Sequence, residues 1–354
     1  MFLALLWLWT IEVTGCSDFQ IKSTDNSLIY ARAMDFIMPL ESQIEIFNKD
    51  HDECSSSPNG DVGICWTSKY GFVGINAFDV PLVTEGMNRK GLTCGYLVMN
   101  NTTYPTINPN DYNKSLSVTD FCMWALGLYS NVNDIKLMLD NGLVRVWGNK
   151  VPVLNIIMKL HIALHDASGN NLVIEFIDGA TILYDNKLGI LTNEPPLQFH
   201  LTNLGLYNRL NPVTSEGAII NGEIIPTIAG SGLDSIPGGW SPISRFVRIA
   251  VLLRYIRGIQ TAQDAITAAS WILNSVYVPN GIEIGVFNNH KVIASTKWGT
   301  IKDVTNMKFY FRGDDGVLRS LNLNKIDFSN NTKHKRYIVR QPPFSIDVTS
   351  SLSN

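Results

Sequence analysis

The sequence has no excess of positive charge and, after its first residues, no long apolar run. Lysine and arginine number 28 against 31 for aspartate and glutamate, so the formal charge is -3 at pH 7. Without a basic excess to neutralise phosphates, we expect no nucleic-acid partner. The apolar segment 153–164, "VLNIIMKLHIAL", is interrupted by Lys159 and His161. We therefore expect no stable membrane span in the body of the protein.

Familiar catalytic motifs are also absent: the sequence holds no P-loop, HExxH, CxxC or GxSxG. The glycine-rich segment 230–239, "GSGLDSIPGG", lacks the GxGxxG spacing and a strand before it, which predicts a loop. His161 and His165 are four residues apart, a metal-ligand spacing only on a helix, whereas their segment alternates as a strand does. We therefore expect no metal site.

Cysteine is scarce and odd in number, with five residues, so at least one thiol stays outside any set of intramolecular disulfides. Cys16 is the candidate for the free thiol. Cys54 and Cys65 flank a turn-rich segment that could close a hairpin, and two interpretations stay open, a disulfide or two ordinary thiols. The remaining two are Cys94 and Cys122.

What the sequence does contain is 45% hydrophobic residues, enough to bury a substantial core. Short extended runs dominate the first hundred residues, and helical spacing follows over 117–142. Hairpin-like runs occupy 160–195, a second helical block spans 243–276, and strands return over 281–313. Because this order lacks βαβ alternation, we expect an α+β fold of two antiparallel sheets stacked face to face, with helices outside.

The first fifteen residues, "MFLALLWLWTIEVTG", resemble the apolar part of a secretory signal and end in small residues before Cys16. We expect export, so that the protein is secreted or periplasmic. Removal of residues 1–15 would leave one domain over 16–354, with a looser polar tail from about residue 328.

Two hypotheses compete for Cys16. In the first, the Val13-Thr14-Gly15-Cys16 pattern is a lipoprotein signal, and an acylated Cys16 anchors a non-catalytic binding module to a membrane. In the second, Cys16 is the first residue of an enzyme, where its thiol is a nucleophile and its α-amine, with a reference pKa of about 7.7 to 8.0, is a base.

The segment "SLIYARAMDF" favours the second hypothesis, because one hairpin would bring Arg32 and Asp35 back beside Cys16. Arg32 would stabilise the thiolate, and Asp35 could accept a hydrogen bond from the α-amine. Taken alone, the same residues also fit a strand with two solvated charges.

With "ARAMD" following Cys16, the chain resembles the choloylglycine hydrolase family of N-terminal-nucleophile hydrolases, which includes conjugated bile salt hydrolases and penicillin V acylases. The resemblance implies a four-layer αββα sandwich and a hydrolase of linear amide C–N bonds that needs no metal or cofactor. It also implies a small-molecule amide substrate and a homotetramer. Further collinear motifs carry it: "EGMNRKGLT" (85–93), "GILTNEP" (189–195), "IPGGWSPISRFVR" (236–248) and "STKWGTIKDVTNMKFYFR" (295–312).

Carried over residue by residue, the family pattern makes Cys16 the nucleophile, with Arg32 and Asp35 in the roles above. Asn193 matches the side chain that stabilises the oxyanion, and Arg245 matches the arginine that completes the site. Without the resemblance, these two would be a turn asparagine and a surface arginine.

One position departs from the commoner family pattern. Val98 stands where bile salt hydrolases have asparagine and penicillin acylases often tyrosine, and it can still supply a backbone N–H to the oxyanion hole. If the register slips, Asn100 or Asn101 could take this place.

The acyl pocket is expected beside Asp35, where Phe36, Ile37 and Met38 supply apolar area. The same three side chains also fit an ordinary hydrophobic core.

Overall fold

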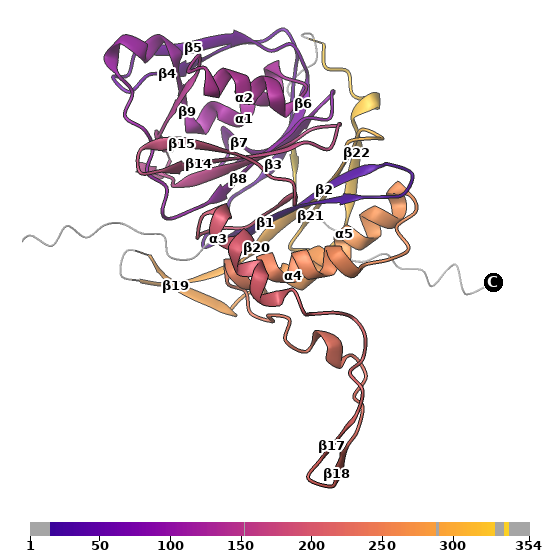
Figure 1. The fold of residues 1–354 in the computed structure, drawn as a ribbon. Helices are drawn as coiled ribbons and strands as arrows, with labels where there is room; N and C mark the ends of the chain where they lie inside the picture. Colours follow the sequence, from indigo (N-terminus) through magenta and orange to yellow (C-terminus); the bar gives the residue numbers. More distant parts are fainter. Residues whose placement is uncertain (1–14, 152, 288–289, 330–335, 340–354) are drawn as a thin grey trace, which may run out of the picture.

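The computed structural model describes residues 15–151, 153–287, 290–329 and 336–339, and Figure 1 shows them arranged in four layers. Two antiparallel sheets stack face to face, with helices on both outer faces. The predicted α+β, αββα architecture is confirmed. Among the described residues, no helix is both long enough and apolar enough to cross a membrane.

The first sheet has seven strands in the order β16-β1-β2-β20-β21-β22, with β19 also paired to β20. It joins segments far apart in the sequence, because the hairpin β1–β2 pairs with β20. Its strands are β1 (Cys16–Lys22), β2 (Leu28–Phe36), β16 (Ile190–Leu191), β19 (Glu283–Phe287), β20 (His290–Asp303), β21 (Lys308–Gly313) and β22 (Arg319–Asn322).

The second sheet has eight strands in the order β15-β14-β13-β8-β7-β6-β3-β23. The polar tail after residue 328 contributes β23 to it, a strand that the sequence did not predict. The strands are β3 (Gln43–Phe47), β6 (Phe72–Ala77), β7 (Val80–Asn88), β8 (Thr93–Val98), β13 (Leu160–His165), β14 (Asn171–Ile177), β15 (Ala180–Asp185) and β23 (Arg336–Ile338).

Helices cover the outer face of each sheet. The predicted pair over 117–142 forms α1 (Phe121–Leu128) and α2 (Val132–Asp140), which pack on the eight-stranded sheet. The block over 243–276 forms α4 (Pro242–Tyr255) and α5 (Ala262–Val276), which pack on β1, β2 and β20. Local sequence sets both starts: Ser241 and Pro242 begin α4, and a Thr261/Asp264 capping box begins α5.

The remaining elements are short and lie at the periphery of the sandwich, and they include one hairpin that projects from it. The strands are β4 (Asp52–Ser56), β5 (Val62–Thr67), β9 (Ser115–Ser117), β10 (Arg145–Trp147), β11 (Lys150–Val151), β12 (Ile156–Ile157), β17 (Ala218–Ile220) and β18 (Glu223–Ile225). The helices are α3 (Leu197–Asn203) and the 3-10 turns Pro109–Lys114, Val118–Asp120, Leu204–Tyr207, Ser231–Leu233 and Leu323–Lys325.

The hairpin β17–β18 projects from the body of the molecule (Figure 1). The segment 230–239 lies at its base and, apart from one 3-10 turn, is the loop that the sequence predicted. In contrast, every residue of β2 is buried, since this strand lies between α5 and the second sheet. Arg32 and Asp35 are therefore inside the protein, not solvated on a strand face.

Two disulfides are formed. Cys54 pairs with Cys65 across the β4–β5 hairpin, which decides between the two alternatives left open by the sequence. Cys94 pairs with Cys122, which links β8 to α1 and was not predicted. Cys16 is the free cysteine, as expected.

Candidate active site

Cys16 begins β1, opposite Met34 of β2, and only 1% of its surface is exposed. Its Sγ lies 3.7 Å from Met34 Sδ and 4.0 Å from Arg32 Nη2. Burial raises the pKa of the thiol above its ordinary value, and the charge of Arg32 opposes that effect. The hairpin therefore brings Arg32 beside the thiol, as the sequence predicted.

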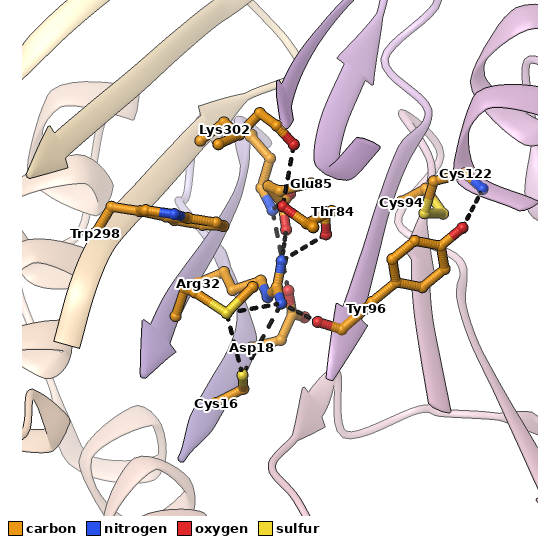
Figure 2. Close-up of polar contacts among 12 residues, drawn as sticks. Cys16, Asp18, Arg32, Thr84, Glu85, Cys94, Tyr96, Cys122, Trp298 and Lys302 are labelled. Carbon is orange, nitrogen blue, oxygen red and sulfur yellow. Dashed lines mark hydrogen bonds and ion pairs between the residues drawn. A yellow bond between two sulfur atoms is a disulfide. The ribbon is translucent and has the colours of Figure 1, made fainter. Parts of the chain in front are cut away.

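Arg32 is held by acceptors on three sides. Its Nη1 donates to Glu85 Oε2 and to the carbonyl of Thr84, each at 2.8 Å, and its Nη2 donates to the carbonyl of Tyr96. The guanidinium also lies 5.4 Å from the ring centroid of Trp298 (Figure 2). With no exposed surface, this cation is fixed in one position next to the thiol.

Asp35 is fully buried and accepts a hydrogen bond from the Thr296 hydroxyl. Burial raises the pKa of its carboxyl to about 7, although Arg245 opposes the shift. Its backbone N–H donates to the carbonyl of Gly15 at 2.8 Å, and a Cβ at residue 15 would lie 2.7 Å from Asp35 Oδ2. The residue before Cys16 thus lies against Asp35.

Asn193 and Arg245 converge on the backbone of Cys16. Asn193 Oδ1 accepts from Cys16 N at 2.6 Å and from Arg245 Nη2 at 2.8 Å, while its Nδ2 donates to the carbonyl of Val98 at 2.7 Å. Arg245 Nη1 donates to the Cys16 carbonyl and, at 2.8 Å, to Ser17 Oγ. With Gly15 attached, the peptide nitrogen of Cys16 is therefore bound by Asn193, not by Asp35.

Arg245 has no exposed surface, so it is not the surface arginine of the simpler interpretation. Its Nε donates to the Trp240 carbonyl at 2.8 Å, which fixes the side chain at the first turn of α4. Asn193 is likewise fully buried, and His200 Nε2 binds its carbonyl at 2.9 Å. Hydrogen bonds with Trp240 and His200 therefore hold Arg245 and Asn193 in place.

The predicted acyl-pocket residues lie in the hydrophobic core. Phe36 and Ile37 are buried, Met38 is partly buried against the same core, and the Phe36 ring lies 6.1 Å from that of Phe78. The packing agrees with the core alternative, and contact with a substrate stays a prediction.

The two histidines four residues apart have other partners than a metal. His161 Nδ1 lies 3.3 Å from Glu175 Oε1, and His165 Nε2 lies 2.5 Å from Asp18 Oδ1. Among the described residues, no group of three or more His, Cys, Asp or Glu side chains is arranged to hold a metal ion.

The sequence reasoning missed a set of buried charges behind Arg32, shown in part in Figure 2. Glu85 binds both Arg32 and Lys302, and Lys302 approaches Asp18 at 3.9 Å. Charged residues within strands are ordinarily interpreted as facing solvent, so the burial of these side chains was not expected. The one available signal was Glu85, the first residue of the "EGMNRKGLT" motif.

The two stacked antiparallel sheets, with helices outside and a cysteine opening the first strand, place the chain in the class of αββα N-terminal-nucleophile hydrolases. More particularly, the model of the linear amide C–N hydrolases, choloylglycine hydrolase family, matches residues 16–337. The chain belongs to this family and is a hydrolase of linear amide C–N bonds.

Individual relatives agree with this assignment. The chain is 29% identical to a bile salt hydrolase/transferase of Clostridium perfringens over 75% of this chain and 80% of that one. It is 26% identical to a penicillin V acylase of Pectobacterium atrosepticum, over 80% of this chain and 73% of that one. A solved structure of a variant of the conjugated bile acid hydrolase from Clostridium perfringens has the same fold, with a TM-score of 0.80 and 23% sequence identity. The match covers 94% of this chain and 99% of that one.

Proposed function

We propose that the mature protein begins at Cys16 and hydrolyses linear amides through a thioester on that residue. The observation that carries the proposal is the arrangement of Arg32 beside the thiol, with Asn193 and Arg245 on the backbone of the same residue. The function rests on this convergence of three buried polar side chains on one cysteine at the start of a strand.

In the first half of the reaction, the Cys16 thiolate attacks the amide carbonyl carbon and a C–S bond forms. The Asn193 side chain and the N–H of Val98 donate to the oxyanion. The C–N bond then breaks, and the protonated α-amine of Cys16 gives its proton to the leaving amine. In the second half, the neutral α-amine takes a proton from water, whose oxygen attacks the thioester and releases the acid and the thiolate.

The contacts of Asn193 support this role. In the chain with Gly15 attached, its Nδ2 donates to the Val98 carbonyl and its Oδ1 accepts from Cys16 N. One N–H of the amide is already directed at Val98, so the second is the donor that we assign to the oxyanion.

As substrates we propose conjugated bile salts, penicillin V or related acyl amides, because relatives with the first two names share most of their length with this chain. Phe36, Ile37 and Met38 would contact the acyl group as part of the apolar wall next to Asp35. Val98 in place of a polar residue leaves this part of the site apolar.

Two further properties belong to the same proposal. We propose export to an oxidising compartment, secreted or periplasmic, which two disulfides and an apolar lead both favour. We also propose a homotetramer, because the projecting hairpin β17–β18 exposes isoleucines that a neighbouring copy would cover.

The test is the Cys16→Ala variant with a panel of conjugated bile salts, penicillin V and fatty-acyl amides. We expect a folded protein with no turnover, since the variant lacks the sulfur that forms the thioester. Turnover at the wild-type rate would contradict the mechanism.

Intact mass and N-terminal sequencing provide the second test. A free amine on Cys16 is expected. An acylated Cys16 would support the alternative, a membrane-anchored, non-catalytic binding module, because neither the thiol nor the amine could then react.

A further inference from the structure

A continuous array of charged side chains lies between the two sheets, behind the nucleophile. Asp18, Arg32 and Lys302 come from the seven-stranded sheet, and Glu85 and His165 come from the eight-stranded sheet. No member has more than 2% of its surface exposed. We call this set the inter-sheet charge array.

The members of the array are linked in sequence from the thiol inward. Arg32, 4.0 Å from Cys16 Sγ, donates to Glu85 Oε2 at 2.8 Å, and Lys302 donates to Glu85 Oε1. The ammonium of Lys302 lies 3.9 Å from Asp18 Oδ2. Figure 2 shows this chain from Cys16 through Arg32 to Glu85 and Lys302.

His165 is the last member of the array when its contacts are followed from Cys16. Its Nε2 lies 2.5 Å from Asp18 Oδ1, its Nδ1 lies 2.7 Å from Asn171 Oδ1, and its ring stacks on Tyr30. Asn171 uses its Nδ2 to donate to Gln20, which identifies its Oδ1 as an acceptor. Both ring nitrogens therefore face oxygen atoms of neighbouring side chains, and these contacts fix the orientation of the ring.

The array places two cations against two carboxylates. Arg32 and Lys302 both contact Glu85, and Lys302 also approaches Asp18. Burial alone would raise the pKa of the Asp18 carboxyl, but His165, Lys302 and Arg32 outweigh it and hold that pKa below its ordinary value. The member nearest the thiol is Arg32, whose charge is opposite in sign to that of a Cys16 thiolate.

Stability alone does not account for such an array, because desolvation largely offsets the attraction within buried ion pairs. The surroundings are also fitted closely to it: a Cβ at Gly95 would lie 2.5 Å from Glu85 Oε2 and 3.3 Å from Arg32 Nη1. The backbone of β8 thus approaches the Arg32–Glu85 pair at a position where a larger residue would displace it.

We propose that Asp18, Glu85, Lys302 and His165 are positioning residues for the hydrolysis, which hold Arg32 beside Cys16 and in this way favour the thiolate. The proposal rests on the proposed function of Cys16 as the nucleophile. The other charged groups that face the thiol are Asp35 on β2 and Arg245 on α4, together with the α-amine, and they stay unchanged in the variants below.

The experiment is a thiol titration that needs no substrate. The ultraviolet absorbance of the Cys16 thiolate is recorded against pH in the purified protein and corrected with the Cys16→Ala variant. Since the other four cysteines are in disulfides, the signal reports Cys16 alone.

Single charge changes should move the midpoint in opposite directions. Lys302→Gln removes a positive charge and should raise it by roughly one pH unit, the size expected for a unit charge acting across a protein interior at an effective dielectric of about 20. Glu85→Gln removes a negative charge, keeps an acceptor for Arg32, and should lower the midpoint by a similar amount. The double variant should return close to the wild-type midpoint.

Lys302→Arg is the matched control, because it changes the shape but keeps the charge, and it should leave the midpoint unchanged. Should Lys302→Gln fail to fold, Asp18→Asn tests the same array from another strand and should lower the midpoint. Single variants with no shift, or with shifts of the same sign, would overturn the proposal and leave the array a structural link between the sheets. A normal titration without any amide turnover would contradict the proposed function instead.

Discussion

Asp35 differs in its protonation from an exposed carboxyl, since burial raises its pKa to about 7. In the unfolded chain the same group has a pKa near its reference value of about 3.9. Between these two values, the folded state binds more protons than the unfolded state. The carboxyl therefore stabilises the fold at low pH, and this contribution is lost as pH rises toward 7.

From this we predict that the free energy of unfolding of the chain with Gly15 still attached falls between about pH 4 and pH 7, by at most about 1.4 kcal/mol per pH unit from this group. Asp35→Asn should flatten that dependence. Urea unfolding at several pH values measures both, and an equal slope in the two proteins would show that Asp35 is not its source.

At this scale, the sequence predicted which residues gather but not how they are bonded. Arg32 could be placed beside Cys16 because one hairpin fixes their register, a local relation. The contacts of Asn193 and Arg245 with Cys16 join positions far apart in the chain, and only the family resemblance pointed to them. Nothing local distinguishes Lys302 or Asp18 from solvent-facing charges, so the array had to be seen in three dimensions.

Among the elements, β8 links the site to the outer helical layer. Tyr96 on this strand accepts a hydrogen bond from Arg32 through its carbonyl, and its hydroxyl accepts from Cys122 N and donates to Val118. The Cys94–Cys122 disulfide spans the same two elements (Figure 2). The position of Arg32 thus depends on how β8 and α1 are joined.

We predict that the loss of either disulfide lowers stability, but that only the loss of Cys94–Cys122 also lowers amide turnover. With sequence separations of 28 and 11, Cys94–Cys122 and Cys54–Cys65 should each contribute roughly 3 to 4 kcal/mol by the chain-entropy argument. Replacing Cys94 and Cys122 by alanine should lower both stability and amide turnover, because Tyr96 loses its support.

The double replacement of Cys54 and Cys65 is the matched control, since their hairpin β4–β5 lies apart from the site, and it should lower stability alone. Urea unfolding and steady-state kinetics measure the two effects. Equal losses of turnover in both double variants would contradict the link through β8.

The sequence located most elements of the sandwich because their signals are local: alternation, helical spacing and turn residues. It missed β23, whose strand character depends on pairing with β3 some three hundred residues earlier. It also missed the hairpin β17–β18 within a segment that lacks the buried face by which strands are ordinarily recognised.

For the whole molecule, the projecting hairpin is the feature that a single copy does not explain. Ile219 and Ile224 expose 74% and 79% of their surfaces there, and Ile220 and Ile225 are exposed beside them. Contiguous apolar surface of this kind marks an interaction site. The homotetramer proposed above would cover it.

We predict that the double variant Ile219→Ser/Ile224→Ser dissociates the tetramer into smaller species, as measured by light scattering after size-exclusion chromatography. Val62→Ser, at a position on β5 that is 65% exposed, serves as the control and should leave the assembly intact. A wild-type protein that is monomeric at all concentrations would contradict the proposal.

The pairing of β2 with β20 also determines when the surroundings of Cys16 are completed during protein synthesis. Cys16 leaves the ribosome nearly three hundred residues before Trp298 and Lys302, which flank Arg32 and Glu85. Until then the N-terminal hairpin has neither its central neighbour nor its buried charges. The surroundings of the nucleophile proposed above are therefore complete only once β20 has docked.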